Sequence, residues 1–222
     1  MPTKTIRYQQ RLGDVLRCLP ACKHLADQGH EVLFDCFPEY RGVFEMVSYV
    51  KAGSGGEILD LEVWPNKYEA YRKSKKSWTD FVYSHPLIKE ADKTNIVLDK
   101  LDPSRALGLP EKYHLIAPFG ISQGYRRDIP SFITNAVKEL GKDVIILCPE
   151  GVNISGLKTY TALSVPEMAK AVRDADEFWA INSAPVLLAN ATRREKTTRF
   201  WGQKEEFETD NCPTFDGLIR MD

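Results

Sequence analysis

The sequence lacks the patterns that mark a zinc protein, a disulfide-bonded domain or a P-loop enzyme. Its 222 residues include only four histidines and five cysteines, and no two cysteines have the CxxC spacing typical of zinc ligands. Neither a Walker motif nor the GxGxxG dinucleotide fingerprint occurs. We therefore expect no metal site and no cofactor, and we expect the cysteines to be reduced, buried thiols.

Excess charge of one sign and long apolar runs are also missing. The net charge is −1 at pH 7, so the overall basic character of many nucleic-acid-binding proteins is absent. The first residues lack the apolar core of a signal peptide, and no apolar run approaches the roughly 20 residues of a membrane span. These absences predict a soluble, cytoplasmic protein, long enough for one large or two small domains.

Strand and helix patterns alternate through the first hundred residues, as in a parallel α/β sheet. Strands are expected at 5–10, 31–36, 49–51 and 57–61, and helices at 14–28, 40–47 and 67–82. Apolar residues in the first of these helices recur with helical spacing. Gly29 follows that helix, at the position where a C-cap glycine is typical.

The alternation restarts after Leu101–Pro110, a segment with two prolines and a glycine. Strands are expected at 113–118, 143–148 and 177–181, with a last one at 197–201, and helices at 130–140, 165–174 and 183–191. Ser164 and Glu167 have the spacing of a capping box at the second of these helices. We expect two α/β domains, residues 1–102 and 103–222, with a ligand cleft between them.

Asp14 is the first candidate for chemistry. The segment Arg11–Ala21 places a Gly13 turn and Asp14 where the first strand gives way to the first helix. Open α/β sheets bind ligands at this edge. Asp14 can stabilise the helix start, and the helix dipole would then lower its pKa. It can instead act as a general base toward an acceptor hydroxyl. The residues alone leave both interpretations open.

The loop after the strand at 113–118 could bind phosphate. It contains Gly120, Ser122, Arg126 and Arg127. Glycine lets the backbone approach a phosphate closely, and arginines pair with phosphate oxygens in a bidentate way. The alternative is an ordinary solvated loop.

A second possible phosphate site lies between the strand at 177–181 and the following helix. Asn182, Ser183 and Ala184 stand at the start of that helix. Backbone amides at a helix start can seat a pyrophosphate. The alternative is that Ser183 only caps the helix.

The stretch Lys67–Trp78 interleaves basic and aromatic residues. Such a pattern can bind an anionic acceptor, including DNA, through its phosphates and through stacking. A solvated helix face is the other explanation.

Several segments together resemble glycosyltransferase family 9, the ADP-heptose:lipopolysaccharide heptosyltransferases and their relatives. The opening of the family is matched by the LGD and LPA residues and by the following Gly-His-Glu-Val. The interdomain LGLP, the phosphate-binding loop and the late donor motif are matched further along. These segments are Leu12–Leu16, Leu19–Ala21, Gly29–Val32, Leu107–Pro110, Leu115–Pro130 and Ala175–Gly202.

The resemblance implies a GT-B fold, with two Rossmann-like parallel-sheet domains facing a central cleft. It also implies inverting transfer from a nucleotide-diphosphate sugar to an acceptor hydroxyl without a metal. By position, Asp14 would be the catalytic base, and the remaining matched residues would bind the donor. Those donor residues are Gly13, Gly120, Ser122, Arg126, Arg127, Asn182, Ser183 and Ala184.

The late motif departs from the family at three positions. Asn182 stands where the family has Asp, Ala184 where it has Gly, and Leu187 where it has His. Backbone amides survive such changes, but the Asp and His side-chain contacts do not. Three hypotheses therefore follow: a glycosyltransferase acting on a glycan or another hydroxyl acceptor, one acting on a modified pyrimidine of DNA, and a nucleotide-sugar-binding module without catalysis.

Overall fold

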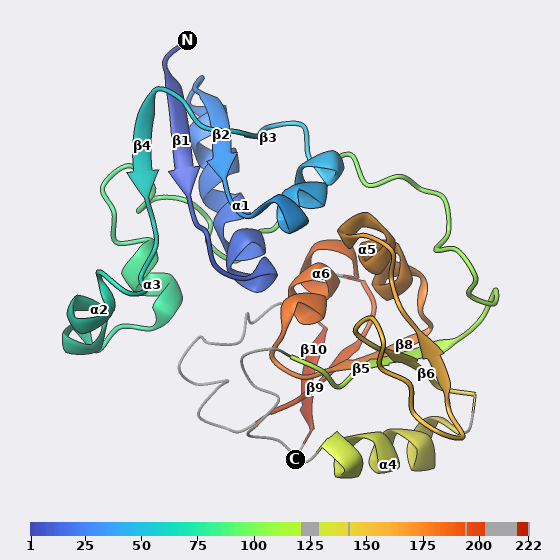
Figure 1. Ribbon diagram of the computed structural model, residues 1–222. Helices are drawn as coiled ribbons and strands as arrows, with labels where there is room; N and C mark the ends of the chain where they lie inside the picture. The colour runs from blue at the N-terminus through green and yellow to red at the C-terminus, as the bar shows by residue number, and fades with distance from the viewer. Residues whose placement is uncertain (121–128, 142, 194, 203–216, 222) are drawn as a thin grey trace. The chain divides into compact units, whose positions relative to one another are not determined.

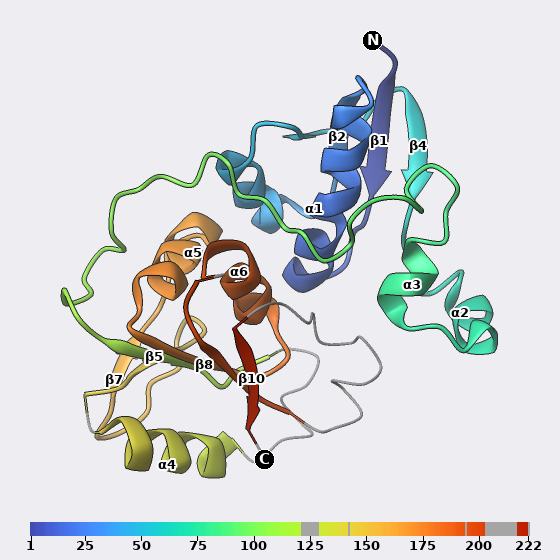
Figure 2. The same ribbon diagram turned by 180° about the vertical axis from the view of Figure 1, so that it is seen from behind.

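The computed structural model describes residues 1–120, 129–141, 143–193, 195–202 and 217–221, which form two compact units. Unit 1 is Met1–Leu101, and unit 2 holds the described residues from Asp102 onward. Each unit has its own parallel sheet with helices packed beside it (Figures 1 and 2). The predicted α/β fold with two parallel sheets is therefore confirmed.

Unit 1 is built on a four-stranded sheet with the order β3-β2-β1-β4. All its strand pairs are parallel. Helix α1 connects β1 to β2 and buries the apolar face that its spacing predicted, including Leu16, Leu19 and Leu25. The elements are β1 (Thr3–Arg7), α1 (Leu12–Asp27), β2 (Glu31–Asp35), the 3-10 helix η1 (Pro38–Met46), β3 (Lys51–Ala52), β4 (Glu57–Asp60), α2 (Tyr68–Ser74) and α3 (Trp78–Val82).

The helical material expected over 67–82 is present, and it forms two helices rather than one. The break falls at Lys75, whose backbone is left-handed with a φ of 55°. Ser77 then begins α3, since its hydroxyl accepts a hydrogen bond from the Asp80 amide at 3.0 Å. A serine that satisfies a free amide favours the start of a new helix.

Unit 2 is built on a six-stranded sheet with the order β10-β9-β8-β5-β6-β7, and its strand pairs are also parallel. Counted within the unit, this order is 3-2-1-4-5-6, which is typical of dinucleotide-binding sheets. The elements are β5 (His114–Ala117), α4 (Ile129–Leu140), β6 (Ile145–Leu147), β7 (Lys158–Tyr160), α5 (Val165–Asp174), β8 (Glu177–Ala180), α6 (Ala184–Thr192), β9 (Thr198–Trp201) and β10 (Leu218–Met221).

Two strands of unit 2 were not expected from the sequence. β7 and β10 have three and four residues, and they lie at the two edges of the sheet. The expectation that residues 197–201 form the last strand is therefore wrong. Strands this short carry little periodicity of their own, and their pairing with β6 and β9 defines them.

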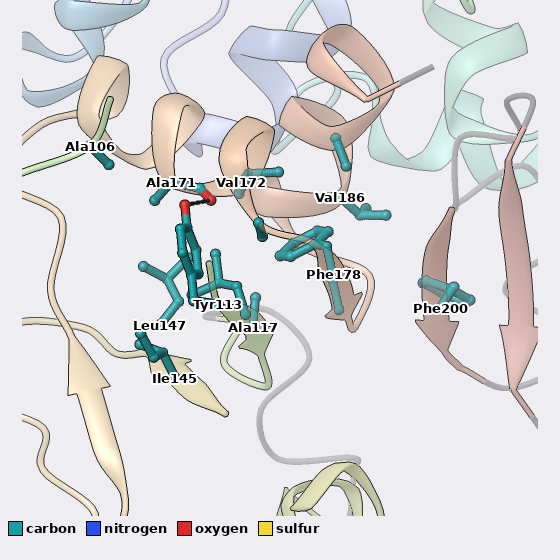
Figure 3. Close-up of a cluster of buried hydrophobic side chains, with 14 residues drawn as sticks. Ala106, Tyr113, Ala117, Ile145, Leu147, Ala171, Val172, Phe178, Val186 and Phe200 are labelled. Carbon is teal, nitrogen blue, oxygen red and sulfur yellow. Dashed lines mark hydrogen bonds between the residues drawn. The ribbon is translucent and has the colours of Figure 1, made fainter. Parts of the chain in front are cut away.

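Helices cover both faces of the unit 2 sheet. α5 and α6 lie on one face and α4 on the other (Figures 1 and 2). Leu115 and Ala117 belong to the apolar cluster under α5 and α6, whereas Ile116 packs on the other face with Phe132 of α4. Alternate residues of a strand point to opposite faces. In the first cluster the Tyr113 hydroxyl donates a hydrogen bond to the Ala171 carbonyl at 2.6 Å (Figure 3).

The segment that begins unit 2 is tied to α5. The Ser164 hydroxyl caps α5 by accepting from the Glu167 amide at 3.3 Å, which is half of the predicted capping box. The Glu167 carboxylate accepts from the Leu107 amide and, at 3.0 Å, from the Tyr160 hydroxyl. Arg173 donates to the carbonyl of Asp102 at 2.8 Å. The beginning of unit 2 is thereby fixed to its helix layer.

Arg193 joins the ends of α5 and α6. Its side chain is 1% exposed and donates to the carbonyls of Val172 at 3.0 Å, Ala175 at 2.5 Å and Thr197 at 3.2 Å. Burial lowers the pKa of this guanidinium to about 10. The guanidinium thus satisfies carbonyls that the end of α5 leaves unpaired.

Candidate active site

The candidate residues follow strands that lie at the point in each sheet where the strand order reverses. In a sheet with the order 3-2-1-4, the connections leave strands 1 and 4 in opposite directions, and ligands bind beyond the carboxyl ends of these strands. These strands are β1 and β4 in unit 1 and β5 and β8 in unit 2. Asp14 follows β1, Gly120 follows β5 and Ser183 follows β8. The expected site residues therefore fall at this switch point in both units.

Polar groups gather at the carboxyl edge of the unit 1 sheet. The Gln9 amide, just beyond β1, donates to the Glu62 carboxylate beyond β4 at 2.6 Å. The Gln9 side chain donates to Asp35 at the end of β2 at 2.9 Å, and Arg7 donates to the same carboxylate at 3.0 Å. This network holds the ends of three strands together beside the start of α1.

Asp14 lies in the first turn of α1, which begins at Leu12 (Figure 1). The amides of Asp14 and Val15 both donate to the Arg11 carbonyl, at 2.9 and 3.1 Å. Gly13 is part of the helix, so the expected glycine turn at this position is wrong. The helix geometry therefore places the Asp14 carboxyl at the ligand-binding edge of the sheet.

Burial raises the pKa of the Asp14 carboxyl. The charges of Arg17 and Arg11 and a hydrogen bond from the Arg11 backbone all oppose the rise, but burial is the largest influence. The expected fall in pKa is therefore wrong, because the buried carboxylate loses more hydration than the helix start and two arginines replace. A carboxylate with a raised pKa is more basic than an exposed carboxylate with the ordinary pKa, and it is therefore a better general base.

The Asp14 charge acts on the phenol of Tyr8, which packs against Trp78. The Tyr8 side chain is 2% exposed, and burial, with a contribution from the Asp14 charge, raises the pKa of its phenol. The Tyr8 ring meets the Trp78 ring edge-on, with 5.5 Å between centroids. The Arg17 guanidinium lies 5.7 Å from the centroid of the same indole and donates to the Thr79 hydroxyl at 3.4 Å. α3 therefore fixes both Tyr8 and Arg17 beside the Asp14 carboxyl.

Gly120 and Ser183 lie against one another beyond adjacent strands of unit 2. A Cβ atom on Gly120 would stand 3.3 Å from the Ile181 side chain and 3.3 Å from the Cβ of Ser183. These distances are tighter than ordinary van der Waals contact, so a larger residue would push the segments apart. Two segments that were separate candidates in the sequence thus lie against one another.

The Ser183 hydroxyl does not cap α6. It occupies the N-cap position, but its side chain donates to the Ile181 carbonyl at 3.1 Å and accepts no helix amide. The interpretation of Ser183 as only a cap is therefore wrong. Ala184 is the first residue of α6, and the preceding Asn182 is 8% exposed. The start of α6 is left uncovered by this side chain, and such a start favours an anion.

The structure does not test the other donor-side candidates together with this contact. Ser122, Arg126 and Arg127 lie outside the described residues. Gly13 belongs to unit 1, whereas Gly120 and the segment 182–184 belong to unit 2. The donor roles assigned to these residues stay predictions.

In the described part of the chain, no three His, Cys, Asp or Glu side chains come together as a metal site. None of the helices that the structure describes is both long and apolar enough to cross a membrane. Cys18, Cys22, Cys36 and Cys148 are buried free thiols, as expected.

Four further residues lie around the site, although the sequence did not single them out individually. They are Tyr8, Arg17, Glu62 and Trp78. Trp78 ends the basic and aromatic stretch at 67–78, so the sequence indicated it as part of that stretch but not as part of this site. Tyr8 follows a strand, which is a signal that could have found it. Arg17 is three residues after Asp14 and shares its helix face.

Comparison with known proteins shows which solved structures share this fold. No protein-family model and no curated protein matches the sequence. TibC from enterotoxigenic E. coli, an iron-containing dodecameric glycosyltransferase, matches with a TM-score of 0.68 and 15% identity over 98% of this chain. A glycosyltransferase family 9 protein of Veillonella parvula matches with a TM-score of 0.66 and 12% identity over 99% of this chain. The chain has the fold of these glycosyltransferases.

Heptosyltransferases share this glycosyltransferase fold. E. coli WaaC, solved with ADP-2-deoxy-2-fluoro heptose, matches with a TM-score of 0.57 and 9% identity, over 99% of this chain and 92% of WaaC. The match covers 85% of the Veillonella protein but only 62% of TibC. The chain thus spans less than two thirds of TibC. The resemblance to family 9 is confirmed at the level of the fold.

Proposed function

We propose that the protein is a glycosyltransferase that moves a sugar from a nucleoside-diphosphate sugar to an acceptor hydroxyl. The observation that carries this proposal is the placement of Asp14 at the switch point of one sheet and of Gly120 and Ser183 at that of the other. The shared fold supports the reaction class. The solved complexes of TibC with ADP-D-β-D-heptose and of WaaC with ADP support a donor of this kind.

On the donor side, the diphosphate would lie against Gly120 and the start of α6. Gly120 has no side chain to cover its backbone, so an anion could approach that backbone and the start of α6 beside it. Ser122, Arg126 and Arg127 would add a hydroxyl and positive charge from the same loop. Donors aimed at the departing diphosphate stabilise the charge that develops in the transition state.

On the acceptor side, Asp14 would act as the base. The acceptor oxygen bonds to the anomeric carbon as the bond from that carbon to the diphosphate oxygen breaks. The acceptor proton passes to the Asp14 carboxylate, and the nucleoside diphosphate leaves. Attack opposite the leaving group inverts the anomeric centre. The half-buried position of Asp14 and its raised pKa support this role, and the proposal includes no metal.

A ligand screen followed by a turnover assay tests the proposal. We expect one class of nucleotide sugar, with ADP-heptose tried first, to raise the melting temperature, since a ligand of the folded state stabilises it by mass action. Release of nucleoside diphosphate is then measured with and without candidate acceptors. Arg127→Ala is expected to weaken donor binding at least tenfold, and unchanged affinity by calorimetry would remove this residue from the donor site.

The same measurements separate the alternatives. If nucleotide sugars bind but neither transfer nor slow donor hydrolysis occurs with any acceptor, the protein is a binding module without catalysis. If no nucleotide or nucleotide sugar binds, the proposed function is wrong.

A further inference from the structure

A row of aromatic rings runs across α2 in unit 1. The centroids of Trp64 and Tyr68 are 4.7 Å apart, those of Tyr68 and Tyr71 are 6.3 Å apart, and those of Tyr71 and Phe81 are 5.5 Å apart. Trp64 is 55% exposed, which is unusual for an indole. The row therefore has an exposed end at Trp64, and the other three rings are partly buried.

Positive charge gathers beside this row. Arg72, Lys73, Lys75 and Lys76 are all exposed, and in the described part of the chain none of the four forms an ion pair. The nearby carboxylate of Asp80 is paired with Lys93, and the Lys76 charge acts on it more weakly. Four unpaired cations within five residues stand out in a chain whose net charge is −1. We call these four residues with Trp64 and Tyr68 the α2 surface.

The α2 surface continues to Asp14 through Arg17. The Arg17 guanidinium lies over Trp78, and its charge is close enough to act on both the Tyr71 phenol and the Asp14 carboxyl. Tyr8 contacts the same indole, and the Asp14 charge acts on its phenol. All these residues belong to unit 1. α2 and α3 also lie beyond the carboxyl end of β4 (Figure 1), at the edge that carries Asp14.

We propose that the α2 surface binds a nucleic-acid strand, and that this strand carries the acceptor hydroxyl. Phosphates would pair with the four cations, and bases would stack on the exposed Trp64 and on Tyr68. A neutral glycan would leave four cations without partners. The acceptor role rests on the proposed glycosyltransferase function, whereas the binding itself does not.

Fluorescence anisotropy of labelled single-stranded and duplex DNA oligomers tests the binding with the full chain. Four phosphate contacts predict that log K against log salt has a slope of about −3 for a single strand. The variant Arg72→Gln/Lys73→Gln/Lys75→Asn/Lys76→Gln is expected to lose most of this slope. Asparagine is used at position 75 because it tolerates the left-handed backbone there.

Two further variants separate charge from stacking. A matched control replaces four exposed lysines elsewhere by glutamine, at positions 51, 100, 112 and 138. It removes the same charge, and we expect it to bind DNA like the wild type. Trp64→Ala is expected to weaken binding about tenfold without changing the salt slope, because stacking carries no charge.

Several results overturn the inference. These are no retention of either oligomer at 50 mM salt, equal binding by the four-charge variant and the wild type, or equal loss in the matched control. Binding of a phosphorylated oligosaccharide with no binding of DNA assigns the surface to a glycan and also overturns it. Donor binding, measured by thermal shift in the same variants, tests the proposed function separately. Absence of donor binding would contradict the proposed function but not the binding of nucleic acid.

Discussion

The Cβ of Ser183 lies 3.3 Å from the position that a Cβ on Gly120 would occupy. These residues are far apart in the sequence, and they meet because β5 and β8 are neighbours that end at the same edge of the sheet. The contact brings together two segments at the position where α/β sheets bind ligands. The size of the side chain at position 120 therefore determines whether the two segments can stay in contact.

Gly120→Ala is expected to lower the free energy of unfolding by about 1 kcal/mol, because the added methyl group must displace Ile181 and Ser183. Donor affinity should fall by about tenfold, since the two segments would separate. Chemical unfolding and calorimetry measure the two effects. Gly55→Ala is the control: its Cβ would meet Leu33 at an ordinary 3.5 Å, so donor affinity should not change. Equal donor affinity in both variants would contradict the prediction.

Asp14→Asn is expected to reduce the rate of transfer by roughly 10²- to 10⁴-fold, which is the usual contribution of a general base. Donor binding, measured by calorimetry, should persist because Asp14 is assigned to the acceptor side. Asp27→Asn, at the exposed other end of α1, is the matched control and should keep full activity. Turnover near the wild-type rate in Asp14→Asn would remove Asp14 as the base.

The same Asp14→Asn variant should be more stable than the wild type at neutral pH. Burial raises the folded-state pKa of Asp14 above its unfolded value, so the folded wild type loses stability as pH rises from the unfolded pKa through the folded pKa. The difference in unfolding free energy should therefore be absent below the unfolded pKa and largest above the folded one. Urea unfolding across this range measures it, and a variant less stable than the wild type at pH 7 would refute the sign.

Arg17→Gln is expected to move the acidic limb of the pH–rate profile to higher pH. Arg17 holds down the pKa of Asp14 against burial, so its loss lets that pKa rise further. Arg11 remains as an opposing charge, and the Asp14 charge also acts on the neighbouring phenols of Tyr8 and Tyr40. Lys23→Gln, on the same helix, should leave the limb in place. A limb that stays in place in Arg17→Gln as well would show that Arg17 does not tune Asp14.

Two serines at helix starts should differ in their contribution to stability. Ser164→Ala removes a hydroxyl that caps α5 and should cost about 1 kcal/mol. Ser183→Ala removes a hydroxyl that donates to Ile181 without capping α6, and we expect a cost below about 0.5 kcal/mol. Thermal unfolding of the two variants side by side compares them. Equal losses would mean that Ser183 caps its helix in solution.

Arg193→Met should destabilise unit 2 by roughly 3 kcal/mol or more, because several buried carbonyls lose their donor. Arg193→Lys should recover little of this, since one ammonium cannot replace the two guanidinium nitrogens that donate to these carbonyls. Urea unfolding gives the free energies. A Lys variant as stable as the wild type would show that charge alone matters at this position.

Much of the fold could be predicted because it rests on local patterns. The apolar spacing of α1, the capping serine at Ser164 and the break at Leu101–Pro110 are visible in short stretches of chain. β7 and β10 could not be predicted, since three or four residues carry no reliable period and only pairing with β6 and β9 makes them strands. The division of 67–82 into α2 and α3 depends on a local feature, the capping residue Ser77. The helical pattern of the whole stretch made this feature hard to recognise.

By itself, the sequence determined the α/β class, the alternation of strands and helices and the position of Asp14 at the start of the first helix. The tertiary structure decided that burial raises the Asp14 pKa, that the Ser183 hydroxyl turns away from α6, and that Gly120 meets Ser183. The reason is physical. Helix starts and apolar periods depend on neighbours a few residues away, whereas hydration of a carboxylate and contact between distant segments depend on what packing places around them.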